Sequence, residues 1–202
     1  MASSDVRAAS FAFGEADARA AALAWIRRRW IASFALARHA SGGPIDSAWV
    51  PFWLIDAHAV AHWEGPGLRG IVEIDFVGLP VCAEASAVLP LMEALEPWPL
   101  SALRAHDARG NGGHVVMPAS LSRDDAITLA RTRMERDLIA TARRSQPAGA
   151  RDKIRMLGAE YPRESCGLAL LPVWRFDDVR AGRRWRIAVN GVTGRTAGRR
   201  IA

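Results

Sequence analysis

The chain has 202 residues with a formal net charge of +6 and a pI near 10.7, and 50% of its residues are hydrophobic. This length and apolar content are sufficient to bury the core of one large domain, which excludes a disordered chain. Arginine supplies nearly all the positive charge, since Lys153 is the one lysine among 27 basic residues. A GC-rich genome produces the same bias as a nucleic-acid surface, so the charge alone assigns no partner.

The first half of the chain predicts helices followed by a hairpin. Residues 15–30 carry small and apolar residues near the 3.6-residue period and predict a helix, and a second short helix is expected at 33–39. Residues 48–63 are rich in tryptophan, valine and alternating alanine, which predicts a strand. The G-P-G sequence at 65–67 turns the chain into a returning strand at 70–77.

The second half predicts a long helix and then an antiparallel meander. A short helix at 88–95 precedes a loop-rich segment at 101–117. A long helix is expected from about Ser122 to about Arg144, because S-R-D-D offers an N-cap and acids in the first turn. From Arg151 the apolar period changes to two, which predicts strands at 152–160, 166–176, 183–190 and, after the N-G-V-T-G turn, 195–200.

One phrase occurs twice in the chain. V-P-F-W-L-I-D at 50–56 and L-P-V-W-R-F-D at 171–177 share the pattern apolar, Pro, apolar, Trp, any residue, apolar, Asp. Each is followed by a turn and a returning strand, which indicates two related strand units, although a coincidence between two apolar strands gives the same text. We therefore expect Trp53 and Trp174 to be largely buried at comparable positions.

These patterns predict an α+β fold. Its antiparallel sheet or sheets are built from the two Pro-x-Trp strand units and covered by an N-terminal helix pair and a long central helix. The domain prediction is a single domain, 1–202, with two pseudo-repeated halves at about 1–100 and 118–202 joined by the loop-rich segment. Residues expected to shape the strand units and the last turn are Pro51, Trp53, Pro172, Trp174, Trp185, Gly191 and Gly194.

The order of several motifs resembles a known family. They are F-A-F-G-E-A-D-A (11–18), W-I-R-R-R-W (25–30), V-P-F-W-L-I-D-A (50–57), L-E-P-W-P-L (95–100), L-L-P-V-W-R-F (170–176) and W-R-I-A-V-N-G-V-T-G (185–194). Over nearly the whole chain this text is similar to the core of bacterial proteins labelled TFIIB-type zinc ribbon or primosomal/replication-like.

The resemblance is confined to that core. Family members usually begin with C-x-x-C ribbons and some end with a membrane segment, and neither occurs in this sequence. No zinc, nucleic-acid or membrane role is therefore carried over. Some members occur beside membrane-scaffold proteins of the SPFH and phage-shock type, so the resemblance implies a membrane-stress or envelope-associated setting and no particular activity.

A cluster of polar residues in the first strand is the candidate metal site. The period of two places Asp56, His58, His62 and Glu64 on one strand face, and imidazole and carboxylate groups are metal ligands. His58 and His62 stand ~13 Å apart along an extended strand, which favours a polar, solvent-facing strand instead. The candidate metal residues are Asp56, His58 and His62, and no cofactor is expected.

Other patterns give no catalytic residue. Cys82 and Cys166 lie far apart among apolar or small neighbours, which predicts reduced, buried thiols and a cytoplasmic protein. The R-G-N-G-G sequence at 109–113 lacks the G-K-[ST] ending of a phosphate loop. No stretch reaches the ~18 apolar residues of a membrane span, and the first residues lack the pattern of a signal peptide.

Arginines crowd the C-terminal strands. On an exposed hairpin they would meet the phosphates of nucleic acid or of a lipid surface. The candidate phosphate contacts are Arg180, Arg183, Arg184, Arg186, Arg195, Arg199 and Arg200.

Three functions follow from the sequence, in order of preference. The first is a non-catalytic interaction or scaffold module that binds another protein. The second is a nucleic-acid-binding protein that uses the C-terminal arginines. The third is a metal-dependent enzyme built on the candidate metal residues. The sequence leaves the oligomeric state open.

Overall fold

The computed structural model describes residues 6–29, 45–84, 89–106, 113–180 and 183–201 of an α+β chain. The chain forms two compact units. Unit 1 comprises Met1–Phe52, Cys82–Ser120 and Leu168–Ala202, and unit 2 comprises Trp53–Val81 and Leu121–Gly167. The units are thus interleaved along the chain, whereas the repeat predicted two consecutive halves. The predicted helix at 33–39 and most of the 109–113 loop lie outside the described residues.

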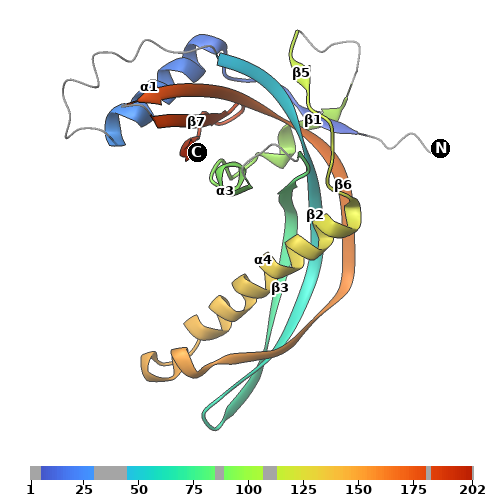
Figure 1. Cartoon of the computed structure of the whole chain (residues 1–202). Coiled ribbons are helices and arrows are strands. Elements are labelled where there is room, and N and C mark those ends of the chain that lie inside the picture. Colours follow the sequence, from blue (N-terminus) through green and yellow to red (C-terminus); the bar gives the residue numbers. More distant parts are fainter. Residues whose placement is uncertain (1–5, 30–44, 85–88, 107–112, 181–182, 202) are drawn as a thin grey trace. The chain divides into compact units, whose positions relative to one another are not determined.

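Unit 2 is a sheet with a long helix on one face. Three strands contribute to it in the order β3 (Leu68–Cys82), β2 (Ile45–Gly65) and β6 (Arg155–Arg180). Helix α4 (Arg123–Arg144) runs along these strands and leads through the 3₁₀-helix η3 (Ala148–Lys153) into β6 (Figure 1). The long helix and the β2–β3 hairpin agree with the elements predicted from the sequence.

The helix begins where its sequence provides a cap. Ser122 is the N-cap, and its hydroxyl accepts a hydrogen bond from the Asp125 N–H at 3.2 Å. Asp124 and Asp125 lie in the first turn and Arg143 and Arg144 in the last, where each charge opposes the near end of the helix dipole. The predicted boundaries of this helix are confirmed.

Alternating residues of β2 form the floor on which the helix packs. One face presents five side chains that are at most 8% exposed, three of them alanines: Ile55, Ala57, Ala59, Ala61 and Trp63. It meets the buried side of α4, formed by Ala126, Ala130, Met134, Leu138 and Ala142. Alanine on both elements allows close approach of helix and strand. The predicted alternation of residues 56 to 64 is therefore observed.

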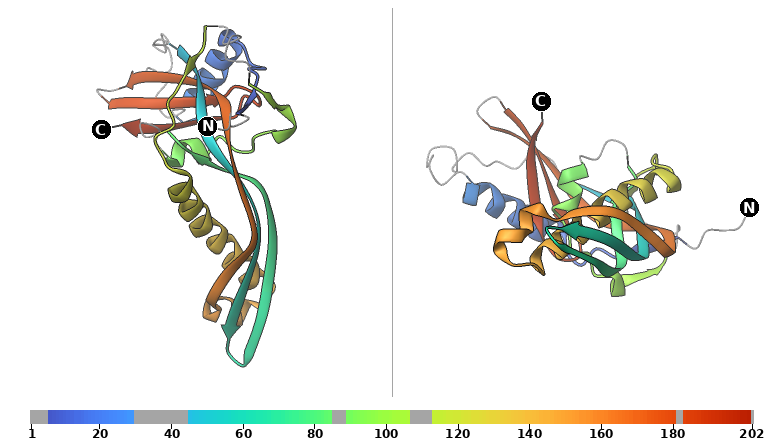
Figure 2. Two further views of the ribbon diagram at one scale, coloured as in Figure 1. Left: turned by 90° about the vertical axis from the view of Figure 1, so that its right-hand side faces the viewer. Right: turned by 90° about the horizontal axis from the view of Figure 1, so that it is seen from below.

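Unit 1 contains the predicted C-terminal meander. Strands β7 (Arg183–Asn190) and β8 (Thr196–Ile201) pair antiparallel with each other, and β7 pairs with the end of β6, as seen side by side in Figure 2. The predicted strands at 152–160 and 166–176 are one continuous strand, β6. On its other side β6 pairs in parallel with β1 (Arg7–Ala9), which pairs with β4 (Leu103–Ala105).

Helix α1 (Glu15–Arg29) covers the meander. Its Ala18, Ala22 and Ile26 pack against four buried residues of β6 and β7, which are Trp174, Phe176, Ile187 and Val189. Short elements complete the unit: α3 (Leu89–Glu93), η1 (Leu100–Ala102) and β5 (Val115–Val116), which pairs in parallel with β2. The core of unit 1 therefore depends on the last two strands of the chain.

The two tryptophans of the repeated phrase lie on strands of different units. Trp174 is buried and donates its ring N–H to the Phe13 carbonyl at 2.9 Å. Trp53 is half-buried and donates to the Leu121 carbonyl at 3.0 Å. The expected burial is met by Trp174 only, and the duplication of two strand units stays a prediction.

Candidate binding surface on unit 2

The sheet of unit 2 has a second face, opposite α4, which we call the open face. Strand alternation places on it the side chains that do not pack against the helix. They are Asp56, His58, Val60, His62 and Glu64 of β2, Ile71, Glu73, Asp75 and Val77 of β3, and Leu157 and Ser165 of β6. Among the described residues of unit 2, no helix lies over this face (Figure 1).

Two polar groups of β2 bind neighbours on the open face. The Nδ1 atom of His58 lies 2.8 Å from a carboxylate oxygen of Asp75, and its Nε2 lies 3.8 Å from Glu73. Asp56 accepts a hydrogen bond from the Gly78 N–H at 2.6 Å and one from the Ser165 hydroxyl at 3.3 Å. These contacts join β2 to the strands on both sides of it.

A second polar group lies near the hairpin turn. Glu64 accepts a hydrogen bond from the Arg155 guanidinium at 2.6 Å, and Arg69 lies 3.7 Å from the same carboxylate. The Arg155 and Arg69 side chains are 75% and 83% exposed, so these ion pairs contribute little stability. They neutralise Glu64, whereas the carboxylates of Glu73 and Asp75, farther along β3, contact His58 and stay mostly exposed.

The candidate metal residues share this face but have different partners. Asp56 binds Gly78 and Ser165, His58 binds Asp75, and His62 lies farther along β2. Within the part of the chain that the structure describes, no group of three or more His, Cys, Asp or Glu side chains is arranged to hold a metal ion.

Apolar side chains stand exposed between these polar groups. Ile71, Val77 and Leu157 are 57%, 75% and 54% exposed. A shallow depression of about 600 Å³ is lined by residues of all three strands, including Asp56, His58, Asp75, Val77, Arg163 and Ser165. Val77 lies at this depression, Ile71 stands ~20 Å farther along β3, and Leu157 lines a second depression with His62 and Arg69. Exposed apolar side chains within a polar surface are typical of a site that another molecule covers.

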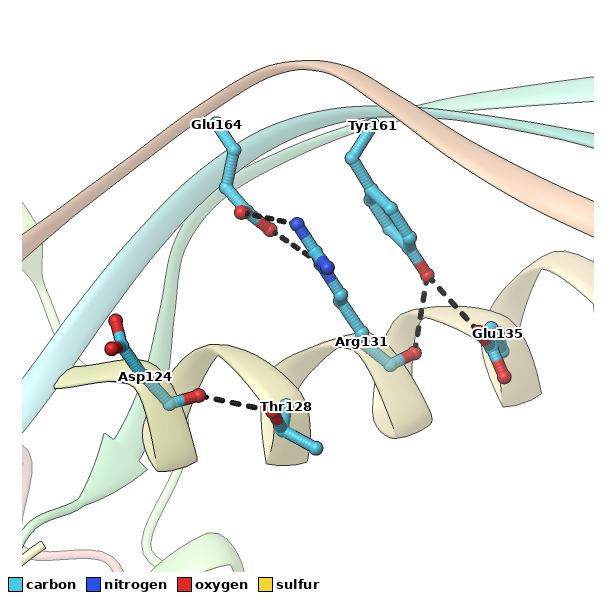
Figure 3. Close-up of polar contacts among 6 residues, drawn as sticks. All are labelled: Asp124, Thr128, Arg131, Glu135, Tyr161 and Glu164. Atoms are coloured by element: carbon cyan, nitrogen blue, oxygen red, sulfur yellow. Dashed lines mark hydrogen bonds and ion pairs between the residues drawn. The ribbon is translucent and has the colours of Figure 1, made fainter. Parts of the chain in front are cut away.

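The opposite face is closed by a polar cluster between α4 and β6. Arg131 makes two hydrogen bonds to Glu164, at 3.2 and 2.8 Å, and its guanidinium lies 4.8 Å from the centre of the Tyr161 ring (Figure 3). The Tyr161 hydroxyl donates to the Arg131 carbonyl at 3.4 Å and lies 3.5 Å from Glu135. This cluster holds the helix on that face of the sheet.

The cluster predicts a shifted tyrosine titration. Burial, and then the Glu135 carboxylate, raise the pKa of Tyr161 to about 12. Because Tyr161 is the sole tyrosine, tyrosinate absorbance near 295 nm reports on it alone. In the folded state the Tyr161 hydroxyl keeps its proton above pH 10, where a tyrosine in the unfolded chain loses it. The contribution of this hydroxyl to the free energy of unfolding is therefore fully present below pH 10 and is lost as the pH rises to about 12. We expect the tyrosine titration of the folded protein to have a midpoint well above pH 10, and Glu135→Gln should lower that midpoint. A titration midpoint of pH 10 in both the wild type and the variant would contradict the contacts of Tyr161 in this cluster.

The described C-terminal arginines of unit 1 lie on both sides of the β7–β8 pair. Arg186 binds both carboxylate oxygens of Asp177, at 2.9 and 3.0 Å, and these hydrogen bonds lower the pKa of Asp177. Arg199 faces Arg186 across the β7–β8 pair, whereas Arg200 faces Trp185 and lies on the other side of the sheet.

Two further members of the arginine cluster have described side chains. Arg195 is exposed and donates to the Ala94 carbonyl at 3.0 Å, and Arg184 is exposed on the side of Arg186. The side chains of Arg180 and Arg183 lie outside the described residues. The interpretation of these arginines as one phosphate-binding stripe is weakened, because Arg186 is paired with Asp177 and Arg200 lies on the other side of the sheet.

Both cysteines are free thiols. Cys82 is buried, and its burial raises the pKa of the thiol to about 11. Cys166 is half-buried, and burial raises its pKa as well. Raised pKa values disfavour the reactive thiolate, so neither residue resembles an activated nucleophile.

Sequence reasoning missed the partners of His58. The hairpin turn held the necessary signal, because His58 stands seven residues before Gly65 and Asp75 seven residues after Leu68, which makes them cross-strand neighbours. The Arg131–Glu164 pair was missed as well. It joins residues 33 positions apart, and no local pattern indicates such a pair.

Fold and surface together define a mixed α+β protein with a sheet covered on one side in unit 2. Comparisons with protein-family models, curated proteins and solved structures found no match to the chain. No helix in the described ranges combines the length and apolar character needed to cross a membrane.

Proposed function

We propose that the chain is a non-catalytic interaction module that binds another protein through the open face of unit 2. The observation that carries the proposal is the exposure of Ile71, Val77 and Leu157 among carboxylates on a sheet face. Burying such side chains against a partner is favourable by about 25 cal/mol for each Å² of apolar surface.

The charges of the face favour a basic partner segment. Glu73 and Asp75 are 60% and 74% exposed, and they flank the apolar side chains of Ile71 and Val77 on β3. A partner that presents apolar side chains together with lysine or arginine would match both features. Complementary charge of this kind mainly sets specificity and the rate of association.

The polar contacts support a binding role over a catalytic one. Asp56, His58 and Glu64 each have a cross-strand partner, and these contacts brace the sheet. A membrane-stress or envelope-associated assembly as the cellular setting, with the protein in the cytoplasm, rests on the family resemblance alone.

The face can be tested with a defined probe. The probe is a fluorescently labelled, soluble peptide that alternates lysine with valine, and its anisotropy is measured against the full chain. We expect micromolar binding that weakens as salt is added, because Glu73 and Asp75 attract the lysines. Val77→Ser should weaken binding about five- to tenfold, since burying a valine side chain contributes ~1.5–3 kcal/mol when complete.

Two controls accompany that experiment. Leu129→Ser changes a 42% exposed leucine on α4, away from the open face, and should leave the affinity unchanged. A peptide with glutamate in place of lysine should bind at least tenfold more weakly. Equal binding of the two peptides, or equal loss in the Leu129 and Val77 variants, would count against the proposal.

Nucleic-acid binding through the C-terminal arginines is the weaker proposal. It is supported by the exposure of Arg184 and Arg199 on one side of the β7–β8 pair. The pairing of Arg186 with Asp177 removes one charge from that side.

A further inference from the structure

The outer edge of β3 presents unpaired backbone groups. In the strand order of the described residues β3 stands at the end, with β2 as its one neighbour. Every second residue of such a strand directs its N–H and C=O groups away from the sheet, where they can pair with another strand. The stretch from Leu68 to Val77 contains no proline, whereas Gly78, with φ of 60°, and Pro80 interrupt the edge beyond it.

We propose that this edge pairs antiparallel with β3 of a second copy of the chain, with Ile71 opposite Ile71 of that copy. The proposal goes beyond the binding of another protein by the open face, because it uses the strand edge and a different partner. In antiparallel pairing, opposite residues point to the same side of the sheet. A twofold axis through Ile71 therefore keeps α4 of both copies on one side and both open faces on the other.

Charge complementarity and the apolar match at Ile71 together select this register. With Ile71 at the axis, Arg69 of each copy stands opposite Glu73 of the other, which gives two cross-strand ion pairs. An axis at Glu73 would place two carboxylates against each other, and like charges directly opposite are destabilising. An axis at Val72 would also place Arg69 opposite an acid, Asp75, but it would place Ile71 against Glu73. The Ile71 axis alone pairs apolar with apolar and acid with base.

The side chains concerned are available for such contacts. The Arg69 side chain is 83% exposed and that of Glu73 is 60% exposed, and their contacts within the chain are long, at 3.7 and 3.8 Å. Ile71 is 57% exposed at the centre of the proposed register. A second copy would cover this isoleucine and satisfy the backbone groups on both sides of it.

Cross-linking tests the register directly. In a Cys166→Ser background, Ile71→Cys and Val77→Cys each place one exposed thiol on the same face of the same strand. With the axis at Ile71, the two thiols introduced at position 71 would be neighbours, whereas the two residues at position 77 would stand ~40 Å apart along the paired strands. We expect a short bismaleimide to yield a covalent dimer from Ile71→Cys and none from Val77→Cys. Equal yields would overturn the register.

Charge exchange tests the pairing without cysteine. Dimer dissociation is measured by sedimentation equilibrium. Arg69→Glu or Glu73→Arg alone should weaken the dimer tenfold or more, and the double exchange should restore it, because the opposite-charge pairs are then re-formed. Thermal melts of each variant show whether it is folded, and rescue by the second exchange separates pairing from instability.

Two results would reject the second copy as the partner of β3. The first is a wild-type protein that is monomeric at ~100 μM. The second is unchanged dimerisation in folded Arg69→Glu or Glu73→Arg protein. Binding of the lysine–valine peptide to a monomer would then leave the proposed function standing. A dimer with the predicted register that ignores the peptide would retain the inference and reject the function.

Discussion

Truncation after Asp177 is expected to abolish soluble folding of the chain. The deletion removes β7 and β8, including Ile187 and Val189, which are 1% and 0% exposed against α1 and the end of β6. Burying each such side chain contributes ~1.5–3 kcal/mol, so the two together approach the 5–15 kcal/mol that stabilise a typical domain. The loss also uncovers Trp174 and Phe176, which would promote aggregation.

The measurement compares the full chain with a 1–177 fragment. Soluble yield and the circular-dichroism melt are recorded for both, and Ile187→Val in the full chain serves as a mild control that should cost about 1 kcal/mol. A soluble 1–177 fragment that melts cooperatively would show that the meander is an appendage rather than part of the core of unit 1.

Replacing Asn190 is expected to have the largest effect of any single substitution in the last turn. The residue is fully buried, and its side chain makes four hydrogen bonds to the backbone. Its amide donates to the carbonyls of Leu95 and Pro97 at 3.0 and 3.4 Å. Its oxygen accepts from the N–H groups of Val192 and Thr193 at 2.9 and 3.0 Å.

Asn190→Ala should lower the free energy of unfolding by about 3 kcal/mol or more, because each buried group left without a partner costs ~1–3 kcal/mol. For a chain of this size that corresponds to roughly 6–12 °C in Tm. Asn190→Asp keeps the accepting oxygen but directs a carboxylate at two carbonyls, so it should be equally damaging at neutral pH. Thr193→Ala, in the same turn but exposed, is the matched control and should change Tm by less than ~2 °C. A Tm for Asn190→Ala within that range would contradict this role.

Strong local signals made α4 and the hairpin predictable. Ser122, with aspartates at the second and third positions after it, specifies a helix start, and the alanines at 57, 59 and 61 alternate along the packed face of β2. The turn around Gly67, with φ of 71°, needs a residue that adopts a left-handed conformation at little cost. Each of these features depends on residues close in sequence, so the chain itself displays them.

The length of β6 could not be predicted for a local reason. Pro162 lies between the predicted strands at 152–160 and 166–176 and indicates a strand end, so the sequence predicts two strands where the structure has one. The alternation of β6 also shifts, because Tyr161 and Glu164 both face α4 although they are three residues apart. A bulge that inserts one extra residue produces such a shift.

Pairings between distant segments account for the rest. Arg7 pairs with Ala169 and with Ala105, and these contacts define unit 1 without leaving any periodic pattern in the sequence. The open face was partly predictable, because alternation alone placed Asp56, His58 and His62 together. Its apolar members on β3 and β6 required the strand order, which the sequence does not display.

Site-specific photo-crosslinking in living cells tests the central claim most directly. A photoreactive amino acid is placed at Val77 on the open face or at Leu129 on α4, and the adducts are identified by mass spectrometry. Our account predicts a defined adduct with another protein from position 77, reduced by Asp75→Lys, and none from position 129. Equal adducts from both positions, or adducts from position 129 alone, would contradict the assignment of the open face as the binding surface.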